Sequence, residues 1–236
     1  MMSPQVDGVL SGWLGAFVPP RCALCHGAST GGPFCDGCTQ SLPWMDRPCR
    51  GCAMPLSDGA RDLCADCLKS APRFDRAWAA FRLLAPVQQL IHQLKYSSNL
   101  AAAHALGTLA AQRLARRAEP LPELMIAVPL HSRRLRSRGY NQALELVRAM
   151  TRVLTITASS TIAQRVHATS DQIGQSAAQR RSNLKGVFAI RGSLSGKHVA
   201  LVDDVMTTGA TLAELAAACR DAGAARVEAW AIARAL

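Results

Sequence analysis

The sequence predicts an α/β protein in which a small cysteine-rich module precedes a mostly parallel sheet flanked by helices. Three observations lead to this class. Eight of the nine cysteines lie between residues 22 and 67. Beyond residue 76, short apolar runs alternate with segments of helical spacing, as is typical of a parallel sheet covered on both faces. The stretch LVDDVMTTGATL, residues 201–212, then joins a predicted strand to a predicted helix through two acids and a threonine-rich turn.

Length and charge limit the possible domain organisation and the possible classes of binding partner. The chain of 236 residues suits one large domain, or a medium domain with a small module. Hydrophobic residues make up 49%, which is enough for an ordinary core. The net charge of +11 favours polyanions, either nucleic acid or phosphorylated small molecules. A generally basic, solvated surface has the same composition, so charge does not choose among these readings.

The amino-terminal apolar stretch, residues 9–18, predicts neither a membrane span nor a signal peptide. It is interrupted by serine and glycine, and it is shorter than the roughly 20 residues that cross a bilayer. It also lacks a basic flank. We therefore expect a cytoplasmic protein with no membrane span. Because cytoplasmic thiols stay reduced, its cysteines are expected to be metal ligands rather than disulfides.

The clustered cysteines form four CxxC pairs, and we expect them to hold two structural zinc ions. The pairs are Cys22/Cys25, Cys35/Cys38, Cys49/Cys52 and Cys64/Cys67. Sequential pairing of neighbouring CxxC turns keeps each loop short and is preferred over an interleaved arrangement, while disulfides and an iron–sulfur cluster remain alternatives. Four thiolates leave no open position on zinc, so these sites are expected to be structural. Cys219, in an alanine-rich segment, is expected to be a buried small hydrophobe.

The remaining chain is expected to contain these elements in order, after a linker over 69–76. They are a strand over 77–84, a helix over 87–96 that follows Pro86, a helix over 100–118, a strand over 124–130, a basic loop, a helix over 141–154, strands over 187–190 and 198–203, a helix over 212–222 and a strand over 226–232. The expected segments are an amino-terminal stretch over 1–18, a double zinc ribbon over 19–70 and an α/β domain over 76–236.

The acid pair Asp203 and Asp204 is expected where a strand ends, just before a turn that opens a helix. Backbone N–H groups and the helix dipole at such a turn favour a phosphate, and threonine hydroxyls add donors. The carboxylates can accept hydrogen bonds from neighbouring sugar hydroxyls. A ribose carrying a 5′-phosphate fits both halves. The alternative is an acidic strand end that merely caps a helix through threonine.

A run of arginines before Gly139 predicts a second anion site. Its members are Arg133, Arg134, Arg136 and Arg138. Guanidinium groups match phosphate oxygens in bidentate pairs, and the predicted helix that follows adds N–H donors. A solvated basic loop and a nucleic-acid patch remain alternatives. His131, just before the run, is either a hydrogen-bond donor to phosphate or an ordinary surface histidine.

The acid pair with its Thr-Thr-Gly turn resembles the phosphoribosyltransferase signature. The stretch AVPLHSRRLRSRGYNQALEL, residues 127–146, the LKYSSN segment around Lys95, a later stretch from Arg165 to Phe188 and the cysteine pairs together resemble the ComF family of competence-associated phosphoribosyltransferase-like proteins. The resemblance covers residues 19–236. It implies a type I phosphoribosyltransferase fold and a ligand-closing hood over 166–186.

The resemblance also implies the function and its residues. Phosphoribosyl pyrophosphate would bind with magnesium, and Asp203 and Asp204 would be catalytic, holding the ribose hydroxyls. The remaining expected substrate-binding residues are Lys95, His131, Arg133, Arg134, Arg136, Arg138, Val205, Met206, Thr207, Thr208, Gly209, Ala210 and Thr211. The implied activity is Mg-dependent phosphoribosyl transfer to an unidentified acceptor, linked to natural competence. The alternative is a non-catalytic module that binds single-stranded DNA, with competence proteins as further partners.

Overall fold

The computed structural model describes residues 21–29, 32–57, 59, 62–166 and 186–236. The chain falls into two compact units, Met1–Leu42 and Pro43–Leu236, and each is described by itself. The expected boundaries at residues 18, 70 and 76 stay a prediction. Among the described residues, no helix combines the length and the apolar character needed to cross a membrane.

In the first unit, the described residues form a small zinc-ribbon-like fold around four cysteines. Arg21 bridges to Ala28 in antiparallel fashion, and helix α2 (Asp36–Gln40) starts directly after Cys35. Phe34 and Leu42 are buried, but a unit of this size has few apolar side chains to bury. Metal binding is the usual source of stability for such a module.

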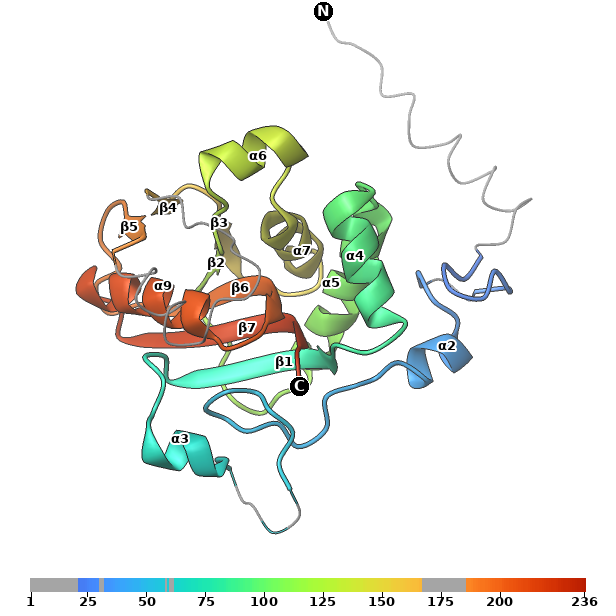
Figure 1. Ribbon diagram of the computed structural model, residues 1–236, viewed down its shortest axis with the longest axis horizontal. Coiled ribbons are helices and arrows are strands. Elements are labelled where there is room, and N and C mark those ends of the chain that lie inside the picture. Colours follow the sequence, from blue (N-terminus) through green and yellow to red (C-terminus); the bar gives the residue numbers. More distant parts are fainter. Residues whose placement is uncertain (1–20, 30–31, 58, 60–61, 167–185) are drawn as a thin grey trace, which may run out of the picture. The chain divides into compact units, whose positions relative to one another are not determined.

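The second unit is built on a five-stranded parallel sheet, which confirms the predicted fold class (Figure 1). The strand order is β1 (Arg76–Arg82), β7 (Arg226–Arg234), β6 (His198–Met206), β2 (Leu124–Ala127) and β3 (Thr157–Ser159). Strands β6 and β7 lie at the centre, with Val202 opposite Trp230. Both strands are almost continuously buried, as expected of strands covered on both faces.

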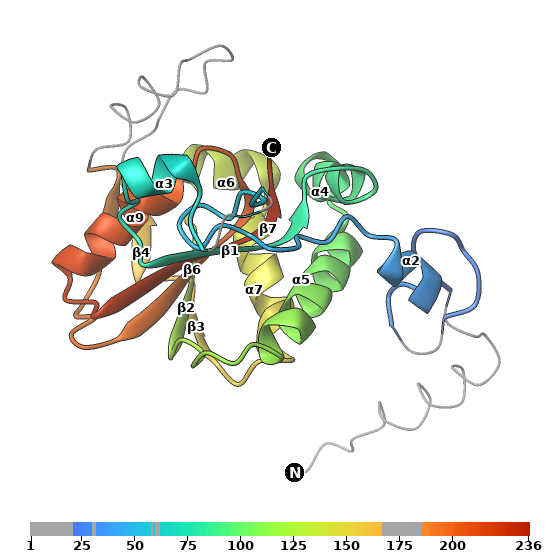
Figure 2. The same ribbon diagram turned by 90° about the horizontal axis from the view of Figure 1, so that it is seen from below.

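Helices cover the sheet on both faces. The chain moves in one direction along the sheet from β1 to β2 to β3, and in the opposite direction from β6 to β7. Right-handed crossovers therefore place α4 (Val87–Tyr96), α5 (Leu100–Ala115) and α7 (Gln142–Thr151) on one face and α9 (Ala210–Asp221) on the other. Figure 2 shows α9 apart from α5 and α7, with the sheet between them.

The structure differs from the expected elements in several places. The strand expected over 124–130 ends at Ala127, and the helix expected over 100–118 ends at Ala115. The basic loop is in fact a short helix, α6 (Ser132–Arg138); its one apolar residue, Leu135, is exposed, so no helical periodicity marked it. Strand β6 continues three residues beyond Asp203, to Met206. Strands β3 and β4 (Ala163–Arg165) were not expected, because three residues are too few to show a period.

Two further small elements lie in the described part of the second unit. Helix α3 (Ala65–Lys69) starts directly after Cys64. Strand β4 pairs antiparallel with β5 (Phe188–Ile190), outside the main sheet, with Ala163 opposite Ile190. Residues 167–185, which make up nearly all of the expected hood, lie outside the described residues.

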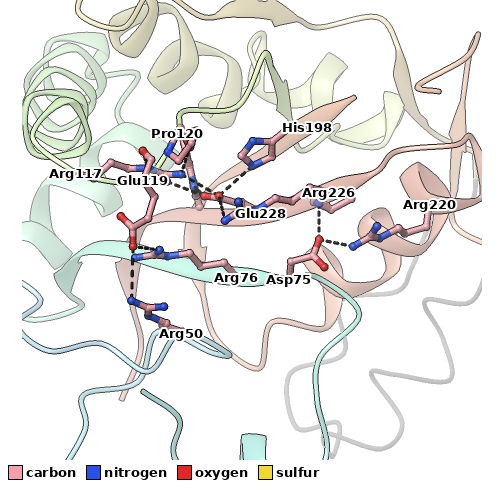
Figure 3. Close-up of polar contacts among 12 residues, drawn as sticks. Arg50, Asp75, Arg76, Arg117, Glu119, Pro120, His198, Arg220, Arg226 and Glu228 are labelled. Atoms are coloured by element: carbon pink, nitrogen blue, oxygen red, sulfur yellow. Dashed lines mark hydrogen bonds and ion pairs between the residues drawn. The ribbon is translucent and has the colours of Figure 1, made fainter. Parts of the chain in front are cut away.

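A buried ionic cluster closes the amino-terminal end of β6 and β7 (Figure 3). The Glu228 carboxylate is fully buried and accepts two hydrogen bonds from Arg117, at 2.7 and 2.9 Å, and one from the Trp230 indole at 2.9 Å. His198 Nε2 lies 3.0 Å away. Burial raises the pKa of Glu228, but the hydrogen bonds from Arg117 and Trp230 outweigh it and lower the pKa overall. The cluster lies at the opposite end of β6 from the acid pair, and we assign it a structural role.

Candidate functional site

The acid pair lies inside strand β6, with the two carboxylates in different surroundings. Successive strand residues point to opposite faces of a sheet. Asp204 is only 7% exposed, and its Oδ2 lies 2.9 Å from Nζ of Lys95, near the end of α4. Asp203 is half-buried, and its Oδ1 accepts a hydrogen bond of 2.8 Å from the Asp204 N–H. The expected residues Lys95 and Asp204 are therefore in direct contact, although 109 residues separate them in sequence (204 − 95).

Asp203 titrates near neutral pH in this setting. Burial and the neighbouring Asp204 charge raise its pKa to about 7, while the Asp204 N–H and the Lys95 charge oppose the rise. Two ionised carboxylates this close repel each other. A cation or a hydroxyl donor bound between them relieves this repulsion. The pair can therefore take up a sugar diol or a hydrated metal ion.

The turn after β6 presents exposed donors at the start of α9. Thr207 and Thr208 are exposed, and the Thr208 hydroxyl accepts a 3.3 Å hydrogen bond from the Ala210 N–H. Gly209 has a φ of +74°, a left-handed conformation that favours glycine. The first-turn N–H groups of a helix have no intrahelical acceptor, so they are suited to an anion.

The other expected turn residues differ in access. Val205, Ala210 and Thr211 are half-buried. The Met206 side chain is buried in the core, so only its backbone faces the turn. This hydrophobic anchoring fixes the strand end from which the turn departs.

Helix α6 carries the expected arginines. The His131 Nδ1 accepts a 3.3 Å hydrogen bond from the Arg133 N–H and so caps the helix, a role the sequence did not suggest. Arg133, Arg134 and Arg136 are exposed. Gly139 ends the helix in a left-handed conformation, and the Asn141 side chain then caps α7. The segment follows β2, the strand beside β6, so its charges belong to the same edge of the sheet as the acid pair.

Contacts from the end of α6 and from Tyr140, just after it, to the end of α4 join this basic segment to the neighbours of Lys95. The Tyr140 hydroxyl donates a hydrogen bond to the Leu94 carbonyl. The Arg138 guanidinium lies over the Tyr96 ring, 5.7 Å from its centre. Tyr96 itself is 70% exposed and stacks at a tilt on His92. The carboxyl edge of the sheet therefore combines two acids, a lysine, an arginine-rich helix and one exposed aromatic ring.

Three residues near the site were not among those expected. Arg165 on β4 lies close enough to Asp203 to interact electrostatically; burial and the Arg134 charge lower its pKa, and Asp203 opposes them. Arg234, at the end of β7, contacts the strand end and turn at Met206 and Thr207. Glu214 on α9 accepts a 2.8 Å hydrogen bond from the Gly186 N–H. These contacts are tertiary, so no local pattern could indicate them.

The eight cysteines form two clusters in the predicted sequential pairing, and both fit zinc. One cluster is Cys22, Cys25, Cys35 and Cys38; the other is Cys49, Cys52, Cys64 and Cys67. In each, the sulfur atoms lie within 4.8 Å of one another. The Cys25–Cys35 and Cys52–Cys64 sulfurs are 3.7 and 3.6 Å apart. Four thiolates at 2.3 Å from zinc would be about 3.8 Å apart, so these spacings fit a tetrahedral ion.

In each cluster a backbone N–H donates a hydrogen bond to a cysteine sulfur, and one thiol has a lowered pKa, while the pKa values of Cys38, Cys52 and Cys67 are raised. The Leu24 N–H donates to Cys22 Sγ at 3.4 Å, and the Cys64 N–H donates to Cys49 Sγ at 3.2 Å. Although burial raises it, the pKa of Cys22 is lowered to about 6 by hydrogen bonds from nearby backbone N–H groups. The balance of the same forces lowers the pKa of Cys64 to about 7. Cys219, by contrast, is fully buried, and burial raises its pKa to about 12, which confirms it as a core residue.

The fold and the site define a phosphoribosyltransferase-like protein with an amino-terminal double zinc ribbon. The double zinc ribbon domain family matches residues 13–68, and the phosphoribosyl transferase domain family matches residues 137–235. The chain belongs to the ComF family, as its relatives show.

Two curated relatives align over nearly their whole length. DNA utilization protein YhgH of Salmonella typhi is 35% identical over 93% of this chain and 99% of its own. Competence protein F of Haemophilus influenzae is 36% identical over 91% of this chain and 97% of its own. Among solved structures, the purine phosphoribosyltransferase of Pyrococcus horikoshii matches with a TM-score of 0.35 and 17% identity, over 56% of this chain and 82% of that one.

Proposed function

We propose that this protein binds phosphoribosyl pyrophosphate with magnesium at the carboxyl edge of its sheet and transfers the phosphoribosyl group to a nitrogen nucleophile. The observation that carries the proposal is the acid pair on β6, with Asp204 held by Lys95, three residues before the turn that opens α9. The family membership and the parallel sheet support it. We place the reaction in the cytoplasm.

Each half of the site takes one part of the ligand. The turn over 207–211 binds the 5′-phosphate through backbone N–H groups and threonine hydroxyls. Asp203 and Asp204 hold the 2′- and 3′-hydroxyls, directly or through metal-bound water. The arginines of α6 and His131 lie along the path of the pyrophosphate. Bidentate guanidinium pairs match its oxygens.

The catalytic contribution is electrostatic. As the bond between C1 and the pyrophosphate loosens, the ribose gains positive charge, which the Asp203 and Asp204 carboxylates stabilise. The leaving pyrophosphate gains negative charge, which Lys95 and the α6 arginines neutralise. When bound at the acid pair, magnesium would supply further neutralisation of the leaving group's charge. Asp203, Asp204 and their hydration shell fit that ion, because carboxylate oxygens and water are its preferred ligands.

Pyrophosphate release tests this proposal. Wild-type protein with phosphoribosyl pyrophosphate, Mg²⁺ and a panel of nitrogen heterocycles should release pyrophosphate, and Asp203→Asn should lower the rate at least 100-fold, by the usual worth of one electrostatic group in a transition state. Asp221→Asn, an exposed acid at the end of α9, is the matched control and should retain full activity. Equal rates for the three proteins would contradict the assignment.

A second candidate function is binding of single-stranded DNA, in a role linked to competence. The relatives' names, a DNA utilization protein and a competence protein, motivate it. The specific observation is Tyr96, a 70% exposed ring beside Arg138 and the arginines of α6. Exposed aromatic rings stack on bases, and a basic surface tracks the phosphates.

Two variants separate these functions. Tyr96→Ala should weaken binding of an oligothymidylate about tenfold if its ring stacks on a base, since one such contact contributes about 1–3 kcal/mol. Asp204→Asn should leave that affinity within twofold while abolishing binding of phosphoribosyl pyrophosphate. If Asp204→Asn lowers the affinity for both ligands by the same factor, the two ligands share one site.

A further inference from the structure

Arg234 occupies an unusual position between the second cysteine cluster and the turn over 207–211. Its side chain is only 8% exposed and reaches in two directions. Its Nε donates a 2.8 Å hydrogen bond to the carbonyl of Cys52, a member of that cluster. Its Nη1 donates to the carbonyl of Met206 at 3.0 Å and to that of Thr207, the first residue of the turn. One guanidinium thus joins both features.

The cysteine side of this connection is packed tightly. A Cβ added to Gly51, next to Cys52, would lie 2.7 Å from Cys67 Sγ, so the loop that carries the Cys52 carbonyl has no room to shift inward. Thiolates around a zinc ion would place negative charge close to the Arg234 guanidinium, which already contacts Cys52.

The turn over 207–211 and the second cysteine cluster line the same cavity. A cavity of about 820 Å³ has cysteines 52, 64 and 67 on its lining together with Thr208, Gly209 and Ala210. Arg234 lines it as well, and Phe74 would lie 3.8 Å from a Cβ at Gly209. The second cysteine cluster is therefore a neighbour of the turn, not a remote module.

We infer that Arg234 is a positioning residue through which zinc in the second cluster sets the conformation of the 207–211 turn, and hence the affinity for a phosphoribosyl ligand. This inference rests on the proposed function for the ligand that the turn binds. Loss of zinc frees the four thiols, and the Cys52 carbonyl loses its fixed place. The buried guanidinium then repacks, and the Thr207 carbonyl moves with it. A displacement of about 1 Å in a binding group is enough to weaken a ligand severely.

Because coupling between two binding sites is reciprocal, the inference can be tested by measuring zinc affinity. If zinc strengthens ligand binding, the ligand must strengthen zinc binding by the same factor. We expect phosphoribosyl pyrophosphate with excess Mg²⁺ to raise the zinc affinity of the second cluster about tenfold, measured at equilibrium against a chelator buffer. The first cluster belongs to the other compact unit and is the internal control, with no change expected. The Cys25→Ser/Cys38→Ser variant, which retains only the second site, assigns the signal.

Arg234→Lys tests the connecting residue, because lysine keeps the charge but loses the planar fork that reaches the carbonyls of both Cys52 and the turn. It should retain two zinc ions per chain, yet lose most of the tenfold effect. Arg82→Lys is the matched control: Arg82 lies opposite Arg234 in the β1–β7 register but is exposed. It should behave as wild type. A merely structural role would lower the melting temperature of Arg234→Lys without changing how the ligand affects zinc affinity.

A second readout needs no ligand. Hydrogen exchange of the peptide that spans 203–215 should accelerate when zinc is removed from the second cluster and stay unchanged when it is removed from the first. Ligand binding without any change in zinc affinity or exchange would overturn the inference and leave the proposed function intact. If the wild type binds no phosphoribosyl pyrophosphate, the proposed function fails. The exchange result then decides alone whether zinc controls the turn.

Discussion

Asp203 and Asp204 are adjacent in sequence, yet the structure gives them different neighbours. Asp204 is paired with Lys95, whereas Asp203 carries the raised pKa and interacts electrostatically with Arg165. The acid–acid–threonine pattern predicted that the pair and the turn belong together, because twelve consecutive residues contain both. It could not predict the partners of the two carboxylates, since Lys95 and Arg165 come from distant segments. The local sequence therefore indicates the candidate residues, but it does not indicate their electrostatic partners.

The raised pKa of Asp203 predicts how stability depends on pH. Its pKa is about 7 in the folded protein and about 3.9 in the unfolded chain, so the folded state binds more protons between these values. Ionisation of Asp203 therefore lowers the free energy of unfolding as pH rises through this window. Asp203→Asn removes the effect, so its stability relative to wild type should increase from pH 5.5 to pH 8.

The expected increase is about 1.4 kcal/mol for each pH unit of the window that is crossed. Urea unfolding with excess zinc at several pH values measures it. Asp221→Asn, an exposed acid, should differ from wild type by the same amount at each pH. A gain for Asp203→Asn that shrinks or stays constant toward pH 8 would show that the Asp203 carboxyl titrates normally.

At the level of elements, the site depends on how closely helices pack behind the sheet. Helical periodicity predicted α4, α5 and α7, because each buries an apolar stripe. It missed α6, which buries nothing and is held by the His131 cap and the Gly139 end. Because α6 buries no residue, a method that detects burial could not find the helix that carries the arginines.

Gly107 on α5 determines how closely that helix approaches α7. An added Cβ would lie 2.8 Å from both Ala149 Cβ and the Leu146 carbonyl oxygen. Gly107→Ala gains about 1 kcal/mol in helix propensity but must separate the two helices, and overpacking costs about 1–3 kcal/mol. We expect a net loss in the free energy of unfolding, measured by urea denaturation. His104→Ala, exposed on the same helix, should cause no loss. A more stable Gly107→Ala would contradict the close packing.

At the scale of the whole molecule, each of the two compact units contains one four-cysteine cluster that fits zinc. Their spacing predicted both sites and their sequential pairing, because CxxC turns are local. Spacing could not show that the second cluster lies in the same unit as the sheet and beside the turn. The Glu228 cluster was also unexpected, since the sequence gives no sign of Arg117, which neutralises the buried glutamate, or of His198, which lies 3.0 Å from it.

Two equivalent glycines distinguish the zinc sites. Gly37 and Gly51 both occupy the third position of a CxxC turn, but an added Cβ meets nothing within 4 Å at Gly37 and lies 2.7 Å from Cys67 Sγ at Gly51. Gly51→Ala should therefore reduce bound zinc from two ions per chain toward one, while Gly37→Ala keeps two. Elemental analysis of the purified variants measures this. Equal zinc content in both would contradict the tight geometry of the second cluster.

The most direct test of the central claim is calorimetric titration of the zinc-loaded protein with phosphoribosyl pyrophosphate and Mg²⁺. Wild type should bind one ligand per chain, and Asp203→Asn/Asp204→Asn should not bind, while it retains two zinc ions and a cooperative unfolding transition. Binding by the double variant with wild-type affinity, or none by folded wild type, would contradict a phosphoribosyl site at the acid pair.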